Sequence, residues 1–388
     1  MTVRLFDENS HLRSFSARVL ACDPDGDRFR VELDRTAFFP EGGGQCGDRG
    51  TLGGAAVLDT QETDRVIFHI TDTPLPVGSE VTGEIDWDLR FGNMQGHSAE
   101  HIISGIVHRR FGYSNVGFHI GEQVTMDFDG ELTDADIADI EAAANEAVYD
   151  DRVITARYPS AEELSVLEYR SKLDLTENVR IVTVEGIDSC ACCAPHVSHT
   201  GEIGVIKITD AMRHRGGMRL FMLAGRAAYR DYAAKSRSAA ELSAMLSAKR
   251  DELPAAVSRV MTALDEARHR LTAAELARVR ARAAALPVTA GSLCLFEDSS
   301  DPNVLRELCN LAAEKAAAAA VFSGTDGDYR YIIGSSRVDL RAASKALNAA
   351  ISGRGGGSPS MIQGSCTADA EALRAFFAAW PGSAENTL

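Results

Sequence analysis

Residues 93–110 read NMQGHSAEHIISGIVHRR, and this stretch decides the fold of the N-terminal half of the chain. Its apolar residues recur at helical spacing and basic residues occupy its last turn, which predicts a helix. His97 and His101 are four positions apart, so both imidazoles leave the same face of that helix and can bind one ion. The stretch therefore predicts a helix that carries half of a metal site.

A second cluster of metal-binding residue types occurs in DSCACCAPHVSHTG, residues 188–201. Cys192 and His196 show the same spacing of four as His97 and His101. Three imidazoles and one thiolate suit Zn²⁺ better than Mg²⁺ or Ca²⁺, whose ligands are oxygens. Either pair alone is weak evidence, but together they predict one zinc site.

The other cysteines of this cluster leave alternatives open. Cys190 or Cys193 could replace Cys192 as the ligand. Cys190 and Cys193 also have the spacing of a redox pair, although the residues after them do not open an amphipathic helix. A metalloprotease helix has Glu directly after the first His, whereas here that position is Ser98 and the acid, Glu100, lies beside the second His.

A glycine-rich stretch, TAFFPEGGGQCGDRGTL, occupies residues 36–52. Gly42, Gly43 and Gly44 lack Cβ atoms, so the backbone can approach a ligand closely and adopt positive φ. Gln45 adds an amide that both donates and accepts hydrogen bonds. A simple hairpin turn is the alternative, but we favour a binding loop.

The alternation of strand-like and helical patterns predicts an α+β chain of four parts. Residues 1–90 form a β-rich, barrel-like module, and residues 91–225 form an α+β domain that holds the zinc site. Residues 226–286 form a long helical hairpin or coiled coil, in which Pro254 marks the change from one helix to the next. Residues 287–388 form a small α/β domain.

Composition restricts the classes of function. The formal net charge of -16 argues against a nucleic-acid partner unless basic residues are concentrated locally. Residues 235–285 contain ten Lys and Arg against six Asp and Glu, which is either a solvated helix face or an RNA contact. Eight cysteines in this length do not indicate a disulfide-rich secreted domain, and no apolar run predicts a signal peptide or membrane span. We therefore expect a soluble, cytoplasmic protein without a membrane partner.

Four motifs resemble a known family in order and spacing. FFPEGGGQ, HSAEH, CCAPH followed by TGEIG, and RHRGGMRLFMLAG are similar to the alanyl-tRNA editing proteins, the AlaX-like relatives of the alanyl-tRNA synthetase editing domain. This resemblance spans residues 1–225. The C-terminal part, which contains GRGGGSPSMIQGS, resembles the Asp-His-His-associated domain of alanyl-tRNA synthetases. The chain has no Asp-His-His phosphoesterase motif, so we expect this domain to bind rather than cut.

The resemblance implies hydrolysis, in trans, of the ester that joins a wrong amino acid to tRNA(Ala), with serine expected first and glycine second. It implies that zinc is held by the ligands His97, His101, Cys192 and His196. It also implies that the glycine loop, Gly42, Gly43 and Gly44, lines the aminoacyl pocket together with Gln45.

Further roles are hypotheses built on that implied reaction. Thr36 and Gln45 are the candidates for reading the serine hydroxyl, because a purely hydrophobic pocket excludes an added hydroxyl poorly. Four protein ligands would close the zinc site, so two alternatives stay open. Either one ligand is displaced and zinc activates the attacking water, or zinc mainly organises the pocket and the water is directed by Glu100 or a substrate hydroxyl. Arg213 and Arg215 are candidate tRNA contacts.

The chain also departs from the family pattern. Cys193, Ala194 and Pro195 stand where Gly-Gly-Thr is common in the synthetases, and Cys46 stands where proline is usual. These changes leave the ligands intact but leave the amino-acid preference open. The alternative functions are a nonenzymatic tRNA-binding protein with a structural zinc, and a zinc peptidase. A homodimer through the helical segment or the C-terminal domain is a further expectation.

Overall fold

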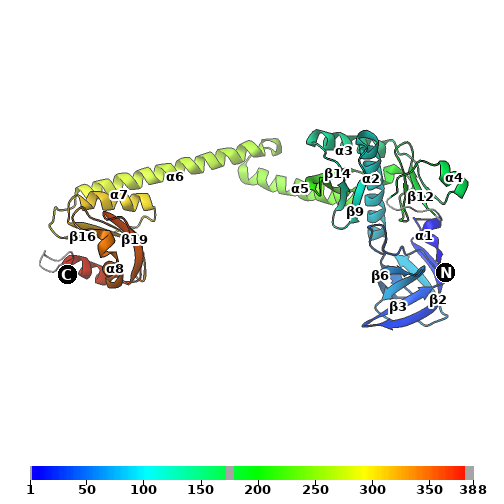
Figure 1. Ribbon diagram of the computed structural model, residues 1–388, viewed down its shortest axis with the longest axis horizontal. Helices are drawn as coiled ribbons and strands as arrows, with labels where there is room; N and C mark the ends of the chain where they lie inside the picture. The colour runs from blue at the N-terminus through cyan, green and yellow to red at the C-terminus, as the bar shows by residue number, and fades with distance from the viewer. Residues whose placement is uncertain (1, 172–178, 381–388) are drawn as a thin grey trace. The chain divides into compact units, whose positions relative to one another are not determined.

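The computed structural model describes residues 2–171 and 179–380 and divides the chain into two compact units (Figure 1). The units are Met1–Ala240 and Glu241–Leu388. Both units contain helices and sheets, so the mixed α+β class is confirmed. The four-part division with boundaries after residues 90, 225 and 286 stays a prediction. None of the helices that the structure describes has the length and apolar composition needed to cross a bilayer.

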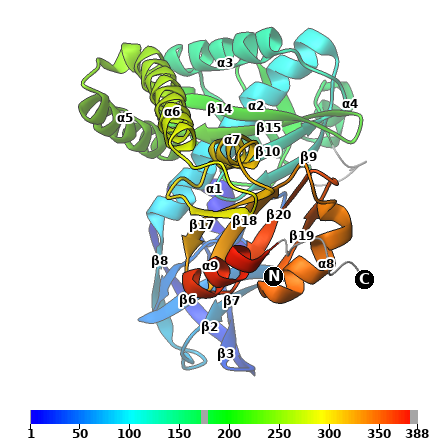
Figure 2. The ribbon, with the colours of Figure 1, turned by 90° about the vertical axis from the view of Figure 1, so that its left-hand side faces the viewer.

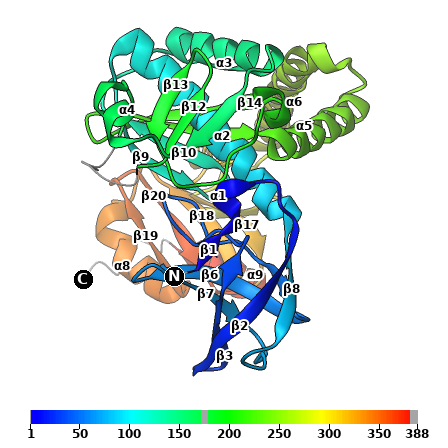
Figure 3. The ribbon, with the colours of Figure 1, turned by 90° about the vertical axis from the view of Figure 1, so that its right-hand side faces the viewer.

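The N-terminal strands close into a six-stranded barrel in the order β2-β3-β7-β6-β5-β8, drawn in blue (Figures 1 and 3). Alternate residues of β2 and β8 are buried and exposed, because successive side chains of a strand point to opposite faces. Phe15, Val31, Leu33 and Leu52 are among the core residues. The barrel strands are β2 Ser14–Asp25, β3 Arg28–Leu33, β5 Gly50–Leu52, β6 Ala55–Thr63, β7 Val66–Thr71 and β8 Glu80–Ile85.

A short parallel pair and a one-turn helix accompany the barrel. Strand β1, Val3–Arg4, pairs with β4, Arg35–Thr36. Helix α1, Leu5–Glu8, follows β1 directly and buries Phe6.

Helix α2, Trp87–Phe111, is the element that the first sequence motif predicts, and the predicted helix is confirmed. It begins six residues before the predicted start because the Asp86 side chain accepts a hydrogen bond from the Leu89 backbone N–H and caps the helix. It ends at Gly112, whose φ of 74° is the left-handed conformation that glycine adopts readily. Most residues from Asn93 to Val107 are buried, so both the apolar and the polar side chains of this segment face protein.

Two antiparallel sheets and helix α3 surround α2 (Figure 3). The core contains Ile102 and Ile103 of α2, Met126 of β10 and Leu220 of β15. The four-stranded sheet has the order β14-β15-β10-β9 and the three-stranded sheet the order β11-β12-β13. The elements are β9 Asn115–Ile120, β10 Val124–Phe128, α3 Asp134–Tyr149, β11 Ile154–Arg157, α4 Ala161–Val166, β12 Ile181–Val184, β13 Asp188–Ala191, η1 Thr200–Ile203, β14 Ile206–His214 and β15 Gly217–Ala224.

Two long helices follow. Helix α5, Gly225–Leu246, ends before the short turn η2, Arg250–Glu252, and α6, Leu253–Ala284, begins with Pro254 in its first turn. The predicted change of helix at Pro254 is confirmed. The apolar seam predicted on α6 is exposed, and its pairing as a hairpin or coiled coil stays a prediction. Its members are Val257, Val260, Leu264, Ala267, Leu271 and Ala274.

The second unit contains a mixed sheet in the order β16-β17-β18-β20-β19, in which β16 and β17 are parallel. Phe322 faces α8 and α9, whereas the next residue back, Val321, faces α6 and α7, so helices cover both faces of the sheet (Figure 2). The elements are β16 Ser292–Phe296, α7 Pro302–Ala313, β17 Ala318–Thr325, β18 Asp328–Gly334, α8 Leu340–Ala350, β19 Gly353–Gly357, β20 Met361–Cys366 and α9 Ala370–Ala379.

Candidate metal centre

His97 and His101 lie one turn apart on α2 and are both buried, with ring centroids 5.5 Å from each other. Cys192 and His196 lie on the loop that follows β13. The ring of His196 is 4.7 Å from that of His97 and 4.6 Å from that of His101, centroid to centroid. The structure therefore brings together the four residues, here called the ligand cluster, that are 91 to 99 positions apart between the two motifs.

The spacing of the ligand atoms fits a tetrahedral ion. The Cys192 Sγ is 3.5 Å from His97 Nε2 and 3.3 Å from His196 Nε2. One ligand atom from each of the four residues lies within 4.8 Å of all the others. Zinc bonds of about 2.0 Å to nitrogen and about 2.3 Å to sulfur place tetrahedral ligand atoms about 3.5 Å apart. The ligand cluster could therefore hold a metal ion.

The second ring nitrogen of each histidine is also bonded. His97 Nδ1 is 3.1 Å from Gln45 Oε1, and His196 Nδ1 is 3.0 Å from Ser98 Oγ. His101 Nδ1 is 3.1 Å from Asp188 Oδ2. Such partners fix the ring orientation and leave Nε2 as the ligand atom, which is the usual arrangement around a protein-bound metal.

Asp188 is itself held by Arg170. The guanidinium donates two hydrogen bonds to the carboxylate, of 2.7 and 2.8 Å. Burial would raise the pKa of Asp188, but Arg170 and His101 outweigh it and lower the pKa to about 2. Asp188 is thus an anion that can accept the Nδ1–H of His101.

The thiol of Cys192 is set up to be a thiolate. Burial opposes its ionisation, but the imidazole cluster around the sulfur outweighs burial and lowers the pKa of Cys192 well below the usual range. Burial also lowers the pKa of His196 to about 3, so that imidazole is neutral at pH 7. Burial opposes the charged form of His101, but Asp188 and Cys192 outweigh it and raise the pKa of His101 well above its ordinary value. A thiolate and neutral imidazoles are the forms that bind metal, so His101 must lose a proton when an ion binds.

The neighbouring thiols take other positions. The Cys190 thiol groups with His101 and Asp188. The Cys193 thiol lies against the glycine loop, 3.9 and 3.8 Å from where Cβ atoms on Gly42 and Gly43 would be. The geometry therefore favours Cys192 over either neighbour as the ligand, and this assignment stays a proposal.

Hydrogen bonds and apolar packing hold the loop of Cys192 against the rest of the first unit, independently of a metal ion. Arg180 donates hydrogen bonds to the carbonyls of Cys192 and Ala194, of 3.1 and 2.8 Å. Ala194 packs with Phe6 and Phe39 in a small apolar cluster.

The glycine loop forms a tight turn against β9. Gly42 and Gln45 exchange two backbone hydrogen bonds, of 3.0 and 3.1 Å. Gly43 and Gly44 have φ values of 60° and 83°, which favour glycine. A Cβ on Gly44 would lie 2.5 Å from the Phe118 carbonyl oxygen, so only glycine allows this approach. The turn places Gln45 beside His97, and the buried Gln45 Nε2 has no hydrogen-bond partner in the described part of the chain.

Glu100 lies beside the ligand cluster. Its Oε1 accepts hydrogen bonds from Ser104 Oγ and Asn115 Nδ2, of 2.5 and 2.6 Å. Its Oε2 is 3.9 Å from His101 Nε2. One carboxylate oxygen is thus fixed by the protein, and the other faces the ligand cluster.

Thr36 has a different environment. It lies in β4 and is fully buried. The His69 Nδ1–H donates to the Val31 carbonyl, so His69 Nε2 accepts the Thr36 hydroxyl proton at 2.8 Å. The Thr36 oxygen also accepts from the Phe38 backbone N–H at 3.1 Å. These contacts occupy the hydroxyl, and a substrate contact by Thr36 stays a prediction.

Arg213 and Arg215 lie at the turn between β14 and β15. Arg213 is largely exposed and pairs with Glu131 at 3.3 Å. Arg215 adopts a φ of 48° in the turn. Their contact with tRNA stays a prediction.

A buried ion pair that the motifs do not predict joins the barrel to α2. Arg90 of α2 is fully buried and donates to both oxygens of Asp48, close to the glycine loop. It also donates to the carbonyls of Ser10 and Ala37. Asp48 in turn accepts from the Phe39 backbone N–H at 2.6 Å. This network fixes the position of the glycine loop relative to the helix of His97.

Two family models match parts of the chain. The model described as Threonyl and Alanyl tRNA synthetase second additional domain matches residues 179–221, which contain Cys192 and His196. The model described as tRNA synthetases class II (A) matches residues 14–89, which contain the barrel. Both matches connect the chain with aminoacyl-tRNA synthetase domains.

Curated relatives make the likeness more specific. Alanyl-tRNA editing protein Aarsd1 of Rattus norvegicus is 32% identical, over 57% of this chain and 58% of that protein. Alanyl-tRNA editing protein AlaX-L of Pyrococcus horikoshii is 33% identical, over 54% of each. Alanine--tRNA ligase of Pyrobaculum neutrophilum is 33% identical, over 96% of this chain and 44% of that protein. The chain spans about half the length of the curated relatives it matches, and the predicted resemblance to alanyl-tRNA editing proteins is confirmed.

A solved structure is also similar in part. The C-Ala domain of Aquifex aeolicus alanyl-tRNA synthetase matches 23% of this chain and 93% of that chain, with 21% identity and a TM-score of 0.20.

Proposed function

We propose that the protein is an aminoacyl-tRNA deacylase that hydrolyses, in trans, the ester between tRNA(Ala) and a wrong amino acid. The observation that carries this proposal is the convergence of His97, His101, Cys192 and His196 beside the glycine loop and Gln45. The similarity to alanyl-tRNA editing proteins supports the choice of substrate.

The proposed metal is zinc, because three imidazole nitrogens and one thiolate sulfur form a set that zinc prefers. When bound by His97, His101, Cys192 and His196, Zn²⁺ would supply a Lewis acid. Residues of the chain supply the proton acceptor and the groups that stabilise negative charge. Glu100 Oε2 accepts a proton from the attacking water, while Ser104 and Asn115 hold its other oxygen. Backbone N–H groups of the glycine loop receive the developing negative charge of the ester oxygen.

We propose serine as the preferred wrong amino acid, with glycine as the second. The buried Gln45 Nε2 needs an acceptor, and a serine hydroxyl supplies one, whereas glycine and alanine do not. Sites that hydrogen-bond a substrate hydroxyl discriminate well, because the analogue without it leaves a buried polar group unpaired.

The deciding experiment is a deacylation assay with Ser-, Gly- and Ala-tRNA(Ala), with and without a chelator. We expect Ser-tRNA(Ala) to be cleaved fastest, Ala-tRNA(Ala) to be spared, and the chelator to stop the reaction. The His97→Ala variant should lose turnover, and the matched control His199→Ala, at an exposed histidine, should keep it. No cleavage of any of the three substrates by the metal-loaded protein would overturn the proposal.

One observation favours a second candidate, a nonenzymatic tRNA-binding protein with a structural zinc. Four protein ligands complete a tetrahedral site, as in structural zinc sites, whereas catalytic sites usually keep one open position. This candidate predicts that the chelator unfolds the protein and that tRNA binding is lost with the fold. Circular dichroism during chelation separates the two candidates. Cleavage of casein would instead support the zinc peptidase.

A cytoplasmic location, tRNA(Ala) as the partner and a homodimer through the helical segment or the C-terminal domain remain part of the proposal. The exposed apolar residues of α6 support the dimer, because such a face is typical of a helix that pairs. Sedimentation of the full chain tests it.

A further inference from the structure

A turn at residues 9–11, between α1 and β2 and here called the N-terminal turn, meets the His196 loop, residues 196–199. The Ser10 hydroxyl donates a hydrogen bond of 2.8 Å to the His196 carbonyl, across 186 positions of sequence. Figures 1 and 3 draw α1, which comes directly before this turn, between the barrel and the sheets around α2. A segment near the start of the chain thus bonds to the backbone of a proposed metal ligand.

The N-terminal turn also reaches the His196 loop through Glu202. His11 Nε2 is 2.7 Å from Glu202 Oε2. The other carboxylate oxygen, Oε1, accepts hydrogen bonds from the backbone N–H groups of Ser198 and His199, at 2.9 and 3.1 Å. Two adjacent side chains of the N-terminal turn therefore hold two parts of one loop.

His196 is buried, so its backbone carbonyl has little access to water. The residue is 4% exposed and its neighbour Val197 is 1% exposed. A buried backbone polar group without a partner costs about as much free energy as a lost hydrogen bond. The Ser10 hydroxyl supplies the partner of the carbonyl, and Ser98 Oγ of α2 supplies that of the Val197 N–H, at 3.3 Å. Burial therefore favours the loop conformation in which both partners are in place.

The position of the His196 backbone limits where its imidazole can lie. The carbonyl carbon and the side chain are bonded to the same Cα atom, so a hydrogen bond that fixes the carbonyl restricts the ring as well. The ring Nδ1 is 3.0 Å from Ser98 Oγ, and Nε2 is 3.3 Å from Cys192 Sγ. A metal site requires its ligands to be placed within about 0.5 Å, and supporting residues secure that placement.

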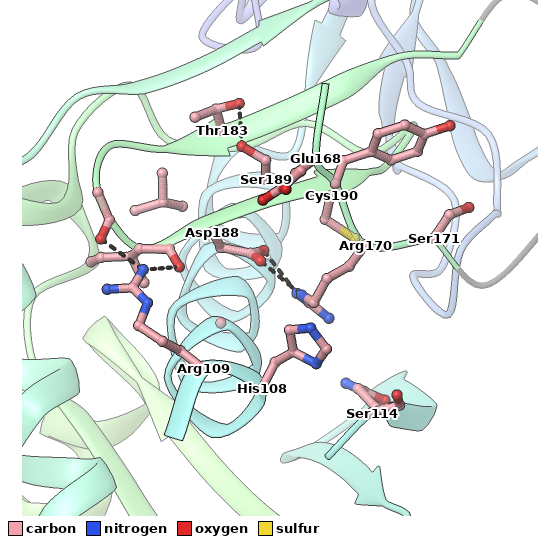
Figure 4. Close-up of a pocket in the computed structure, with 16 residues that line it drawn as sticks. His108, Arg109, Ser114, Glu168, Arg170, Ser171, Thr183, Asp188, Ser189 and Cys190 are labelled. Carbon is pink, nitrogen blue, oxygen red and sulfur yellow. Dashed lines mark hydrogen bonds and ion pairs between the residues drawn. The ribbon is translucent and has the colours of Figure 1, made fainter. Parts of the chain in front are cut away.

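His101 has a support of the same kind. Its Nδ1 is bonded to Asp188, and Figure 4 shows the Arg170 guanidinium directed at that carboxylate. One residue holds the ring, and a second residue holds the first. For His196 the corresponding support reaches the backbone of the loop, and it comes from the N-terminal turn.

We infer that Ser10 and His11 are positioning residues for the metal site, which act through the His196 carbonyl and Glu202 to hold the His196 imidazole toward the other ligands. The inference rests on the proposed function for the identity of the ligands, and it adds the residues that place the last of them. The N-terminal turn is itself held against α2, because Arg90 Nη1 donates to the Ser10 carbonyl at 3.0 Å.

The test measures metal binding by the full chain separately from hydrolysis. Ser10→Ala removes the hydroxyl, Ser10→Thr keeps one, and Ser16→Ala, at an exposed position of β2, is the matched control. In a chelator competition we expect Ser10→Ala to bind zinc about tenfold more weakly than the wild type, and Ser10→Thr and Ser16→Ala to bind it equally well. The absorption bands of the Co²⁺-substituted protein report ligand geometry, and they should shift in Ser10→Ala alone among these variants.

A second variant tests the contact through Glu202. His11→Phe keeps a ring beside Trp87 and Phe91, whose ring centroids lie 5.9 and 6.4 Å from that of His11, and removes the bond to the carboxylate. We expect it to weaken zinc binding by at least about threefold. Should Ser10→Ala fail to fold, His11→Phe gives the decision.

The outcomes separate the inference from the proposed function. If both variants bind zinc less tightly but the wild type cleaves no aminoacyl-tRNA, the proposed function fails and the positioning role stands. If the wild type cleaves Ser-tRNA(Ala) while both variants keep its zinc affinity and its Co²⁺ spectrum, the inference is wrong, even where the variants unfold at lower urea concentration. A wild type that binds neither Zn²⁺ nor Co²⁺ also overturns the inference, whatever its activity.

Discussion

Replacement of Arg90 by methionine tests whether the buried ion pair holds the barrel to α2. The Arg90 and Asp48 side chains are 0% and 1% exposed, so the substitution leaves a carboxylate in the interior without its counter-charge. Breaking a buried pair in this way costs about 3–5 kcal/mol. The Ser10 and Ala37 carbonyls also lose a donor, which adds about 1 kcal/mol each. We therefore expect a loss of at least about 4 kcal/mol in the free energy of unfolding of the first unit.

Urea unfolding followed by Trp87 fluorescence measures this loss. The chain has two tryptophans, so a Trp380→Phe background leaves Trp87, at the start of α2, as the reporter. The control is Arg152→Met, because Arg152 pairs with Asp150 at side chains that are 34% and 52% exposed. A pair in solvent contributes at most about 1 kcal/mol. If Arg90→Met costs no more than Arg152→Met, the role assigned to the buried pair is refuted.

Three further predictions concern the site and the barrel. Gln45→Ala should reduce the preference for Ser-tRNA(Ala) over Ala-tRNA(Ala) in deacylation, and unchanged selectivity would remove Gln45 from that role. Asp188→Asn should weaken zinc affinity by about 10–100-fold in a chelator competition, because a neutral amide holds the His101 ring less firmly than the Asp188 carboxylate does. An unchanged zinc affinity would contradict this role of Asp188. Burial lowers the pKa of His69 to about 4 from its ordinary value of 6.5, so the neutral form stabilises the fold above pH 6.5 and up to about 3 kcal/mol is lost as the pH falls from about 6.5 toward about 4. Urea midpoints across this range should fall less steeply for His69→Leu than for the wild type, and equal slopes would argue against the effect.

The ligand cluster is the part of the site that local sequence spacing predicts best. His97 and His101 share a helix face at any register, because their spacing matches one turn. Cys192 and His196 lie close together because they are only four positions apart in a short loop. The two pairs meet because α2 packs against the loop after β13. In the sequence, only the combined chemistry of the four residues indicates this contact.

The partners of the ligands were not predictable in the same way. Asp188 is one of many acidic residues, and its contact with His101 depends on how α2 packs against β13. Gly105 allows this packing, because a Cβ there would lie 2.7 Å from the Asp188 Cβ. Arg90 and Asp48 are 42 positions apart in the sequence, and they meet because the barrel closes next to α2. Such contacts leave no periodic signal in one sequence.

Thr36 makes contacts that its sequence motif does not indicate. Its place ahead of the glycine loop makes it a natural candidate to meet substrate, yet its hydroxyl is shared by His69 and the Phe38 backbone. His69 stands among apolar residues in VIFHI, where strand alternation points it inward. That alternation indicates a buried histidine, which needs hydrogen-bond partners, but it does not identify Thr36 as one of them.

The anchoring of the Cys192 loop by Arg180 bears on the speed of metal exchange. Because the carbonyls of Cys192 and Ala194 are tied down, an arriving ion meets donors already in place and little chain entropy is lost on capture. Release of the ion likewise brings little gain in chain entropy, because the loop stays ordered without it. A loop held in this way favours tight retention of the metal ion that we propose for the ligand cluster.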